Sequence, residues 1–282
     1  MSIVAIDLGG TAIKGGLFAQ GKLVKEAKRP TEASKGRDAL LDSLAALTKG
    51  LGDDRLEAVG LSTAGEVDPK EGKIVYATDN LPGWTGTPVA EILSERLGVP
   101  VRVENDAIAA LLGEMSQDAS LGDDVTMLTF GTGVGGASCV RGLIRREKRC
   151  EWGHRVIVEG GRPCNCGKRG CAEAYLSATA FSKDAAALGY PSPLALAEAA
   201  RKGEEGAISL VVLFQERLSL LLDLILKEVS PKVILLGGGL MGSYDILAKP
   251  LEGAYPICPA KLGNRAGVYG AYSLWKEGVK HA

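Results

Sequence analysis

The sequence predicts an α/β fold of two lobes with a cleft between them. Segments with the apolar spacing of strands and of helices alternate along the 282 residues. Each half begins with two strands joined by a turn of small residues, over 3–18 and again over 125–140. This repeated order suggests an ancient duplication, and the 46% hydrophobic content is ample for two cores.

The first half is predicted to be a three-stranded meander followed by helices and strands in turn. Leu40, Leu41, Leu44 and Leu47 have the spacing of one helix face, which predicts a helix over 37–47. The other expected helices cover 89–97 and 107–115, and the expected strands cover 3–6, 13–18, 22–28, 56–62 and 99–103.

The second half is predicted to contain strands at 125–130, 137–140 and 233–236, a glycine turn at 131–136, and helices near 208–229 and 267–277. We place the lobe boundary near 116–123. This gives an N-terminal lobe of residues 1–118 and a C-terminal lobe of residues 119–266. The last helix, within 267–282, is expected to fold back onto the N-terminal lobe.

Composition and charge exclude several classes of partner. The 33 basic and 34 acidic residues leave no basic field that would attract nucleic acid. The N-terminus lacks the basic start and apolar run of a signal peptide, and no stretch has the character of a membrane span. Three of the six cysteines lie together, which favours a metal site in a reducing compartment over disulfides. We therefore expect a cytoplasmic protein that acts on small molecules.

Three glycine-rich turns could each receive a phosphate or a nucleotide. The turn at 7–11 has two glycines whose bare backbone can approach a phosphate, and Asp7 can hold magnesium or its bound water. The turn at 131–136 precedes a strand, which favours a phosphate cradle over a dinucleotide-binding turn. The turn at 237–239 follows an apolar strand and could lie against an adenosine. An ordinary hairpin or strand-to-helix turn would also explain any one of them.

The segment Glu104-Asn105-Asp106 lies between a predicted strand and a predicted helix. A carboxylate at the end of a strand is well placed to act as a general base. Alternatively, Asn105 or Asp106 caps the helix that follows. The residues alone leave both interpretations open.

Cysteines and a histidine form the strongest single signal. Cys164, Cys166 and Cys171 lie within eight residues on a glycine-rich loop, and His154 lies ten residues before the first of them. Three thiolates and one imidazole make a closed tetrahedral zinc site. Because four protein ligands leave no open position for water, the metal is expected to be structural.

Five motifs taken together resemble the ROK family. They are DLGGT at 7–11, END at 104–106, GTGVGG at 131–136, EWGH at 151–154 and CNCGKRGC at 164–171. The resemblance spans almost the whole chain, and the last two motifs are highly specific. It implies the actin-like, hexokinase-like two-lobed ATPase fold, with ATP and a sugar meeting in the central cleft.

The resemblance also implies roles for individual residues. Asp106 would be the general base that takes the proton from the attacking sugar hydroxyl. His154 would serve twice, with one ring nitrogen on zinc and the other on the sugar. The other sugar-binding residues would be Gly65, Asn80, Asn105, Glu151 and Glu173. The residues around magnesium, phosphates and adenosine would be Asp7, Gly9, Gly10, Thr11, Lys14, Gly131, Thr132, Gly133, Gly135, Gly237, Gly238 and Gly239.

The sequence suggests glucose, phosphorylated at O6, as the substrate. The stretch NLPGW at 80–84 points to glucokinases, whereas STAGEVDPKEGKIVYA at 62–77 resembles N-acetylmannosamine kinases. That sugar or another N-acetylhexosamine is therefore the alternative. Two features depart from the family pattern: a short basic loop at 143–150, which could alter the sugar rim, and Ala137 where a third glycine is usual.

A protein that senses sugar without catalysis is a further alternative. The family's repressors carry a helix-turn-helix segment before the kinase-like part, whereas the DLGGT motif here starts at residue 7. The intact Asp106 also favours catalysis, because binding alone needs no base. We therefore expect a kinase that uses ATP, Mg²⁺ and a structural Zn²⁺ and that forms a homodimer.

Overall fold

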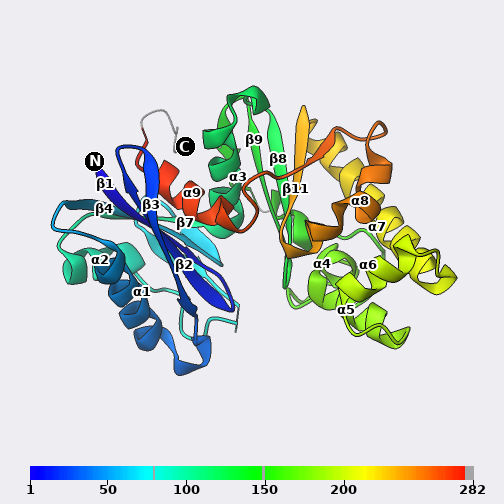
Figure 1. Cartoon of the computed structure of the whole chain (residues 1–282), viewed down its shortest axis with the longest axis horizontal. Helices are drawn as coiled ribbons and strands as arrows, with labels where there is room; N and C mark the ends of the chain where they lie inside the picture. The colour runs from blue at the N-terminus through cyan, green and yellow to red at the C-terminus, as the bar shows by residue number, and fades with distance from the viewer. Residues whose placement is uncertain (79, 148–149, 277–282) are drawn as a thin grey trace. The chain divides into compact units, whose positions relative to one another are not determined.

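The computed structural model describes residues 1–78, 80–147 and 150–276 (Figure 1). The chain folds into two compact units, each with its own five-stranded sheet. The first unit holds the residues up to Ala119 together with the C-terminal segment from Arg265, and the second unit spans Ser120–Asn264. The last helix therefore belongs to the first unit, although the whole second unit precedes it in the sequence.

The sheet of the first unit has the strand order β3-β2-β1-β4-β7. Its strands are β1 Ser2–Leu8, β2 Ala12–Ala19, β3 Lys22–Pro30, β4 Leu56–Thr63 and β7 Val101–Asn105. β1, β4 and β7 run parallel, and the register sets Leu8, Thr63 and Asn105 side by side at their carboxyl ends. The loops that follow these strands therefore start from one edge of the sheet, where ligands of open α/β sheets bind.

Both faces of this sheet are covered. Successive side chains of β1 point to opposite faces, and apolar residues occur on both of them. Val4 and Ile6 belong to the core that α1 and α2 complete, while Ile3 and Ala5 pack on the other face with Val268 of α9. The helices of this unit are α1 Arg37–Leu51, α2 Val89–Leu97, α3 Asp106–Gln117 and α9 Ala266–Ser273. A small hairpin of β5 Glu66–Asp68 and β6 Lys73–Tyr76 lies outside the main sheet.

Glycines allow α9 to pack very close to its neighbours. A Cβ on Gly270 would lie 1.8 Å from the carbonyl oxygen of Ala109 in α3. A Cβ on Gly60 of β4 would lie 2.0 Å from the carbonyl oxygen of Ala271. Neither position has room for a side chain, so α9 meets the sheet and α3 through direct contacts between backbones.

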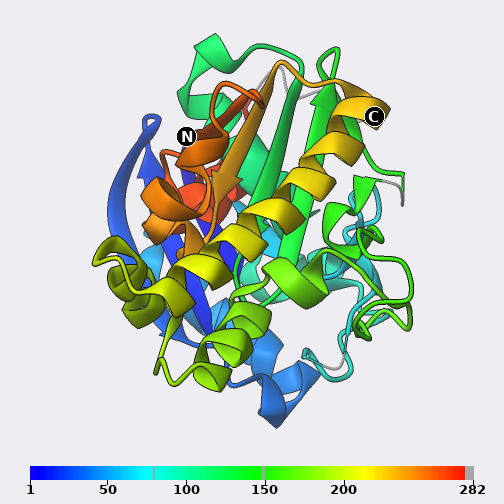
Figure 2. The ribbon, with the colours of Figure 1, turned by 90° about the vertical axis from the view of Figure 1, so that its right-hand side faces the viewer.

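The second unit has the strand order β10-β9-β8-β11-β12. Its strands are β8 Val125–Phe130, β9 Val134–Val140, β10 Leu143–Arg145, β11 Val233–Gly237 and β12 Ile257–Pro259. Its helices are α4 Glu173–Leu176, α5 Ala178–Ala187, α6 Pro193–Arg201, α7 Glu205–Val229 and α8 Tyr244–Leu247. Figure 2 shows α7, in yellow, running across one face of this sheet, where Leu218 and Leu222 are buried against Leu128 and Ile234.

Most of the predicted elements are present, with several boundaries shifted by a few residues. β7 starts at Val101 rather than at residue 99 because α2 ends at Gly98, whose φ is 70°, and Pro100 follows. α9 ends at Ser273, and Glu277, the predicted end of that helix, lies outside the described residues together with Lys148 and Arg149 of the basic loop. Within the described ranges, no helix is both long and apolar enough to cross a bilayer.

Candidate active site and metal centre

In the first unit, Asp7 lies on β1 at the carboxyl edge of the sheet and is held by its neighbours. The hydroxyl of Ser62, its partner in the register of β4, donates a hydrogen bond of 3.0 Å to Oδ1. Nζ of Lys14 on β2 lies 3.4 Å from Oδ2. The ion pair and the hydrogen bond fix the carboxylate, and both come from the two strands that pair with β1.

The turn after β1 offers open backbone N–H groups. The hydroxyl of Thr31 donates to the carbonyl of Gly9 at 2.6 Å, and the N–H of Thr31 donates to the carbonyl of Thr11 at 3.2 Å. In the described chain, the N–H groups of Gly10 and Thr11 have no acceptor, and Gly10 has no atom within 4 Å of an added Cβ. Bound carbonyls and open N–H groups give this turn the polarity of an anion cradle.

Asn105 caps α3, one of the two roles that the residues left open for this segment. Its Oδ1 accepts hydrogen bonds from the N–H groups of Ala107 and Ile108, at 3.0 and 3.1 Å. Its Nδ2 donates to the carbonyl of Gly65 at 2.9 Å and to Asp106 Oδ1 at 3.1 Å. These four bonds use the whole capacity of a primary amide, so Asn105 positions Asp106 and the Gly65 loop.

Asp106 is the first residue of α3, and the capping hydrogen bonds from Ala107 and Ile108 are accepted by Asn105. Burial raises the pKa of its carboxyl to about 6, and the negative charge of Asp7 adds to this effect. Hydrogen bonds from the N–H of Ala107 and from Asn105 oppose the rise. The result is a carboxyl that is ionised at neutral pH yet basic enough to accept a proton.

The two segments predicted to border the sugar are fixed by backbone and indole contacts. Gly65 has a φ of 108°, and a Cβ there would lie 2.6 Å from the carbonyl oxygen of Tyr76, so only glycine fits. Trp84 is fully buried and donates from its indole nitrogen to the hydroxyl of Thr63 at 3.1 Å. Asn80 is exposed on the loop that Trp84 anchors.

In the second unit, the turn at 131–133 repeats the pattern of the first. The N–H of Ala178 donates to the carbonyl of Gly131 at 2.8 Å, and the hydroxyl of Thr179 donates to that of Thr132 at 2.8 Å. Among the described residues, the N–H groups of Thr132 and Gly133 have no acceptor. In both hairpin turns, carbonyl groups are therefore hydrogen-bonded while N–H groups are left open.

The predicted glycine turn at 131–136 is shorter than expected. β9 already begins at Val134, and Gly135 pairs with Thr129 of β8 instead of lying in the loop. Gly136 is small for a packing reason, because a Cβ there would lie 2.8 Å from the ring of Trp152. The turn itself therefore consists of residues 131–133.

The three glycines at 237–239 have different structural reasons for lacking a side chain. Gly237 ends β11, and Gly238 has a φ of 89° with no room for a Cβ, which would lie 2.5 Å from the backbone nitrogen of Phe130. The turn itself accounts for Gly238. Gly239 begins the short 3₁₀ helix Gly239–Ser243, and an added Cβ would meet no atom there, so it alone leaves open space for a ligand.

The metal-ligating residues come together as predicted. One ligand atom each from His154, Cys164, Cys166 and Cys171 lies within 4.8 Å of all the others. His154 Nδ1 is 3.6 Å from Cys164 Sγ, and the Sγ atoms of Cys166 and Cys171 are also 3.6 Å apart. Tetrahedral zinc with metal–sulfur bonds of about 2.3 Å requires ligand separations of roughly 3.5–3.8 Å. The two separations of 3.6 Å meet this requirement, and the one to His154 is made by Nδ1.

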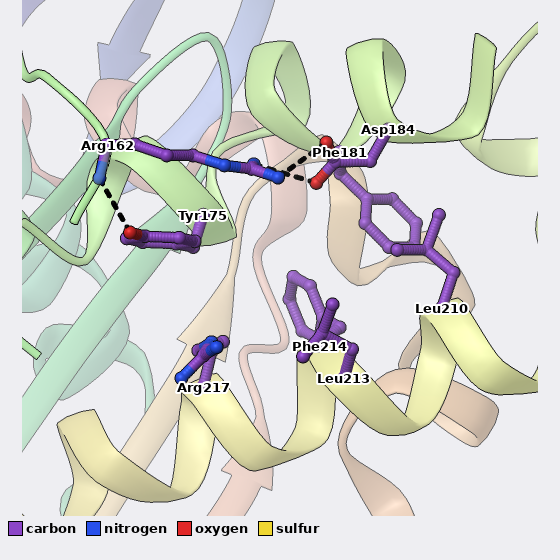
Figure 3. Close-up of a pocket in the computed structure, with 8 residues that line it drawn as sticks. All are labelled: Arg162, Tyr175, Phe181, Asp184, Leu210, Leu213, Phe214 and Arg217. Atoms are coloured by element: carbon purple, nitrogen blue, oxygen red, sulfur yellow. Dashed lines mark hydrogen bonds and ion pairs between the residues drawn. The ribbon is translucent and has the colours of Figure 1, made fainter. Parts of the chain in front are cut away.

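The loop that carries the thiols is anchored on α4 and α5 (Figure 3). The N–H of Arg162 donates to the hydroxyl of Tyr175 at 2.7 Å, and its guanidinium makes two bonds to Asp184 at 2.8 and 2.9 Å. Gly161 has no room for a side chain, because a Cβ would lie 2.1 Å from the same hydroxyl. The cavity of about 70 Å³ beside these residues is lined by Phe181, Phe214 and other side chains, and none of the predicted site residues lines it.

Glu151 immediately precedes the short 3₁₀ helix Trp152–His154, and His154 ends it. This helix packs against β9. Trp152 is fully buried, and its indole nitrogen donates to Ser138 at 3.0 Å. A Cβ on Gly153 would lie 1.8 Å from the carbonyl oxygen of Val134. The structure thus leaves the Glu151 side chain exposed on a firmly packed turn.

Glu173 joins the metal loop to the glycine turn, a link that the sequence did not predict. It follows Cys171 by two residues, and its Oε2 accepts a hydrogen bond of 3.0 Å from the N–H of Val134. A Cβ on Gly133 would lie 2.3 Å from the same oxygen. No spacing in the sequence relates residues 133 and 173, so only the fold reveals the contact.

Gly133→Ala is expected to impair both substrates, because the new methyl group must displace the Glu173 carboxylate. We expect the KM values for sugar and for ATP to rise together, by about tenfold, since a lost charge-assisted hydrogen bond is worth about 1.5–3 kcal/mol. Gly206→Ala is the matched control, because Gly206 is exposed on α7 and a Cβ there meets no atom within 4 Å. A rise in the KM for ATP alone would contradict the role given to the Gly133–Glu173 contact.

Comparison with known proteins places the chain in a family. The ROK family model matches residues 3–278. The chain is 31% identical to a glucokinase of Thermotoga maritima, over 99% of this chain and 98% of the relative. It is 33% identical to an N-acetyl-D-glucosamine kinase of Shigella flexneri, over 83% of this chain and 82% of the relative.

A solved structure gives the same assignment. A ROK family glucokinase from Streptomyces griseus, in complex with glucose and AMPPNP, superposes with a TM-score of 0.81 and 29% identity, over 97% of this chain and 99% of that one. The expected actin-like ATPase fold is thereby confirmed. The five motifs, the two glycine-turned hairpins and these whole-length similarities lead to one conclusion: the chain belongs to the ROK family.

Proposed function

We propose that the protein phosphorylates glucose at O6 with ATP, using Asp106 as the general base. The coarser activity, ATP-dependent phosphorylation of a sugar, follows from membership of the family and from similarity to glucokinases along the whole chain. The observation that carries the finer proposal is the environment of Asp106. Its carboxyl is held by Asn105 and the N–H of Ala107, and its pKa of about 6 suits a base at neutral pH.

The proposed step is an in-line transfer. Asp106 takes the proton of the O6 hydroxyl as that oxygen forms its bond to the γ-phosphorus, and the bond from phosphorus to the β–γ bridging oxygen breaks to release ADP. The open N–H groups of the turns at 10–11 and 132–133 would receive phosphate oxygens. Asp7, Lys14 and Thr11 are the residues we assign to the phosphates and to magnesium, which would neutralise phosphate charge when bound with ATP.

We assign the His154–Cys164–Cys166–Cys171 cluster to a structural zinc ion. The donor set is complete without water, and the separations fit a tetrahedral site. With Nδ1 of His154 facing the metal position, Nε2 is left to meet a sugar hydroxyl, alongside Glu151 and Glu173. The metal would thus orient sugar-binding side chains and take no part in bond making.

An N-acetylhexosamine is the second candidate substrate. The stretch at 62–77, which resembles N-acetylmannosamine kinases, forms the end of β4 and the small hairpin of β5 and β6. The similarity to the Shigella N-acetyl-D-glucosamine kinase also supports it. Gly65, whose carbonyl Asn105 holds, ties this stretch to the base.

A panel of sugars with ATP tests the proposal. We expect glucose to give a higher kcat/KM than mannose, N-acetylglucosamine and N-acetylmannosamine, since specificity is a ratio of these values. A higher value for either N-acetylhexosamine would replace glucose by the second candidate. Sugar binding without turnover of any member would favour a sugar-sensing protein and overturn the assignment of Asp106.

The pH dependence of kcat/KM follows from the same carboxyl. The base must be ionised, so activity should fall about tenfold per pH unit below a midpoint that lies near the Asp106 pKa of about 6. Because this pKa is raised on folding, the folded protein holds the proton longer than the unfolded chain, and stability should decline as pH rises through the window from about 4 to 6. Rate profiles and thermal unfolding across this range check both signs. A flat rate profile down to about pH 5 would contradict the assignment.

A further inference from the structure

The first turn of α9 lies directly against the Asp7 carboxylate. A Cβ on Gly267 would lie 2.5 Å from both Cγ and Oδ1 of Asp7 and 2.9 Å from Oδ2. Real Cβ atoms do not approach other atoms so closely, so a side chain at residue 267 and the present position of Asp7 exclude each other. Both residues belong to the first unit, and the contact connects its last helix to its first strand.

The backbone conformation does not require glycine at this position. The φ of Gly267 is not in the left-handed region, and its three nearest contacts are all atoms of Asp7. Gly270, one turn later, is different, because there the backbone of Ala109 excludes a side chain. Glycine inside a helix costs about 1 kcal/mol relative to alanine, so its presence at 267 has a stability cost that the contact with Asp7 explains.

The Asp7 carboxylate has little freedom to move aside. Its two oxygens are engaged by Ser62 on β4 and by Lys14 on β2, and its side chain is only 14% exposed. The N-terminal turn of α9 supplies a third boundary, and the partial positive charge of a helix N-terminus favours a carboxylate there. α9 itself is fixed, because Gly270 and Gly60 hold it in direct backbone contact with α3 and β4.

We propose that Gly267 is a positioning residue for Asp7, and that the missing side chain in the first turn of α9 sets the place of this carboxylate. The proposal rests on the proposed function, in which Asp7 acts on magnesium and the phosphates of ATP. α9 would then contribute to catalysis without touching either substrate. Sugar recognition would be unaffected, because the three atoms nearest to an added Cβ all belong to Asp7, which we assign to magnesium and the phosphates.

Gly267→Ala tests the proposal in the full-length protein. We expect kcat to fall by about 10²-fold, the usual cost of displacing a reacting or orienting group by about 1 Å. The Mg²⁺ concentration for half-maximal rate should rise, and the KM for glucose should stay within threefold. MgADP should also raise the melting temperature less than in the wild type, which is a readout independent of turnover.

Gly50→Ala is the matched control. Gly50 lies near the end of α1, is exposed, has no positive φ, and an added Cβ there meets no atom within 4 Å. This substitution should leave kcat, the Mg²⁺ dependence and the response to MgADP unchanged. It controls for the gain in helix propensity that any glycine-to-alanine change brings.

A double-mutant cycle with Asp7→Ala separates positioning from general damage, even if Gly267→Ala alone folds poorly. In the Asp7→Ala background the clash is gone, so Gly267→Ala should raise the melting temperature, as alanine does in an unobstructed helix. A fall in both backgrounds would overturn the proposal, as would an active Gly267→Ala enzyme with unchanged kcat and Mg²⁺ dependence. A wild-type protein that turns over no sugar would instead refute the proposed function, while the stability cycle would still test the contact.

Discussion

Asp106→Asn is expected to lower kcat by about two to four decades while leaving the KM for sugar nearly unchanged, because it removes only the proton acceptor. The amide keeps the size of the carboxyl and an oxygen that can accept the N–H of Ala107, so the start of α3 should remain intact. Steady-state kinetics with glucose and ATP measure the effect. A loss of less than threefold would contradict the role of Asp106 as base.

Stability distinguishes catalysis from capping in the same variant. The Asp106 pKa is raised from 3.8 to about 6, roughly two units, so the ionised carboxyl costs the fold at most about 3 kcal/mol at neutral pH. Asp106→Asn removes this cost and should raise the melting temperature above pH 6, with a smaller effect at pH 4. A clear loss of stability would instead mean that Asp106, like Asn105, is needed for the cap.

Asp38→Asn is the matched control for this variant. Asp38 lies in the first turn of α1, as Asp106 lies in the first turn of α3, but its side chain is 74% exposed and pairs with Arg37. Replacing it should cost no more than a few tenths of a kcal/mol, as is usual for surface changes. Its kcat should equal that of the wild type.

Cys166→Ser is expected to abolish zinc binding and to weaken sugar recognition. Cys166 is exposed, so the substitution removes a ligand with little loss of packing. We expect zinc content to fall from about one per chain to near zero, since structural sites need all four ligands. The KM for sugar should rise by at least about tenfold, because the metal orients His154 and the loop that leads to Glu173.

The KM for ATP should rise less, because the metal loop reaches the glycine turn at 131–133 only through the hydrogen bond from the N–H of Val134 to Glu173. Elemental analysis, thermal unfolding with and without a chelator, and kinetics check these outcomes. Cys258→Ser, a change in β12 outside the metal loop, should retain the zinc and the sugar KM. A wild-type protein without zinc when purified free of chelators, or a zinc-free variant with unchanged sugar affinity, would refute the coupling.

The sequence predicted the elements well where apolar periodicity is strong. The helix at 89–97 and the strand at 125–130 have the predicted bounds, because both consist of regular apolar patterns between clear turn residues. The helices α4, α5 and α6 were not predicted. α4 has four residues, and α5 and α6 are rich in alanine, so their apolar patterns are weak.

Glycine motifs were less informative about individual residues than about the turns. The GTGVGG stretch predicts a phosphate cradle over the whole motif, but Gly135 lies in β9 and Gly136 makes room for Trp152. A missing side chain can serve a ligand, a positive φ or a close neighbour, and the sequence shows only that it is missing. The structure separates these reasons because it shows what a Cβ would meet at each position.

What the sequence by itself determined is local: the strand and helix segments. It also offered candidates, namely a carboxylate at 106 and a set of possible metal ligands that lie close together in the chain. Contacts between distant residues depend on the tertiary structure. The parallel register of β1, β4 and β7 places Ser62 on Asp7, and the return of α9 places Gly267 there as well. The raised pKa of Asp106 arises in the same way, because burial and the charge of Asp7 exist only once strands far apart in sequence share one sheet edge.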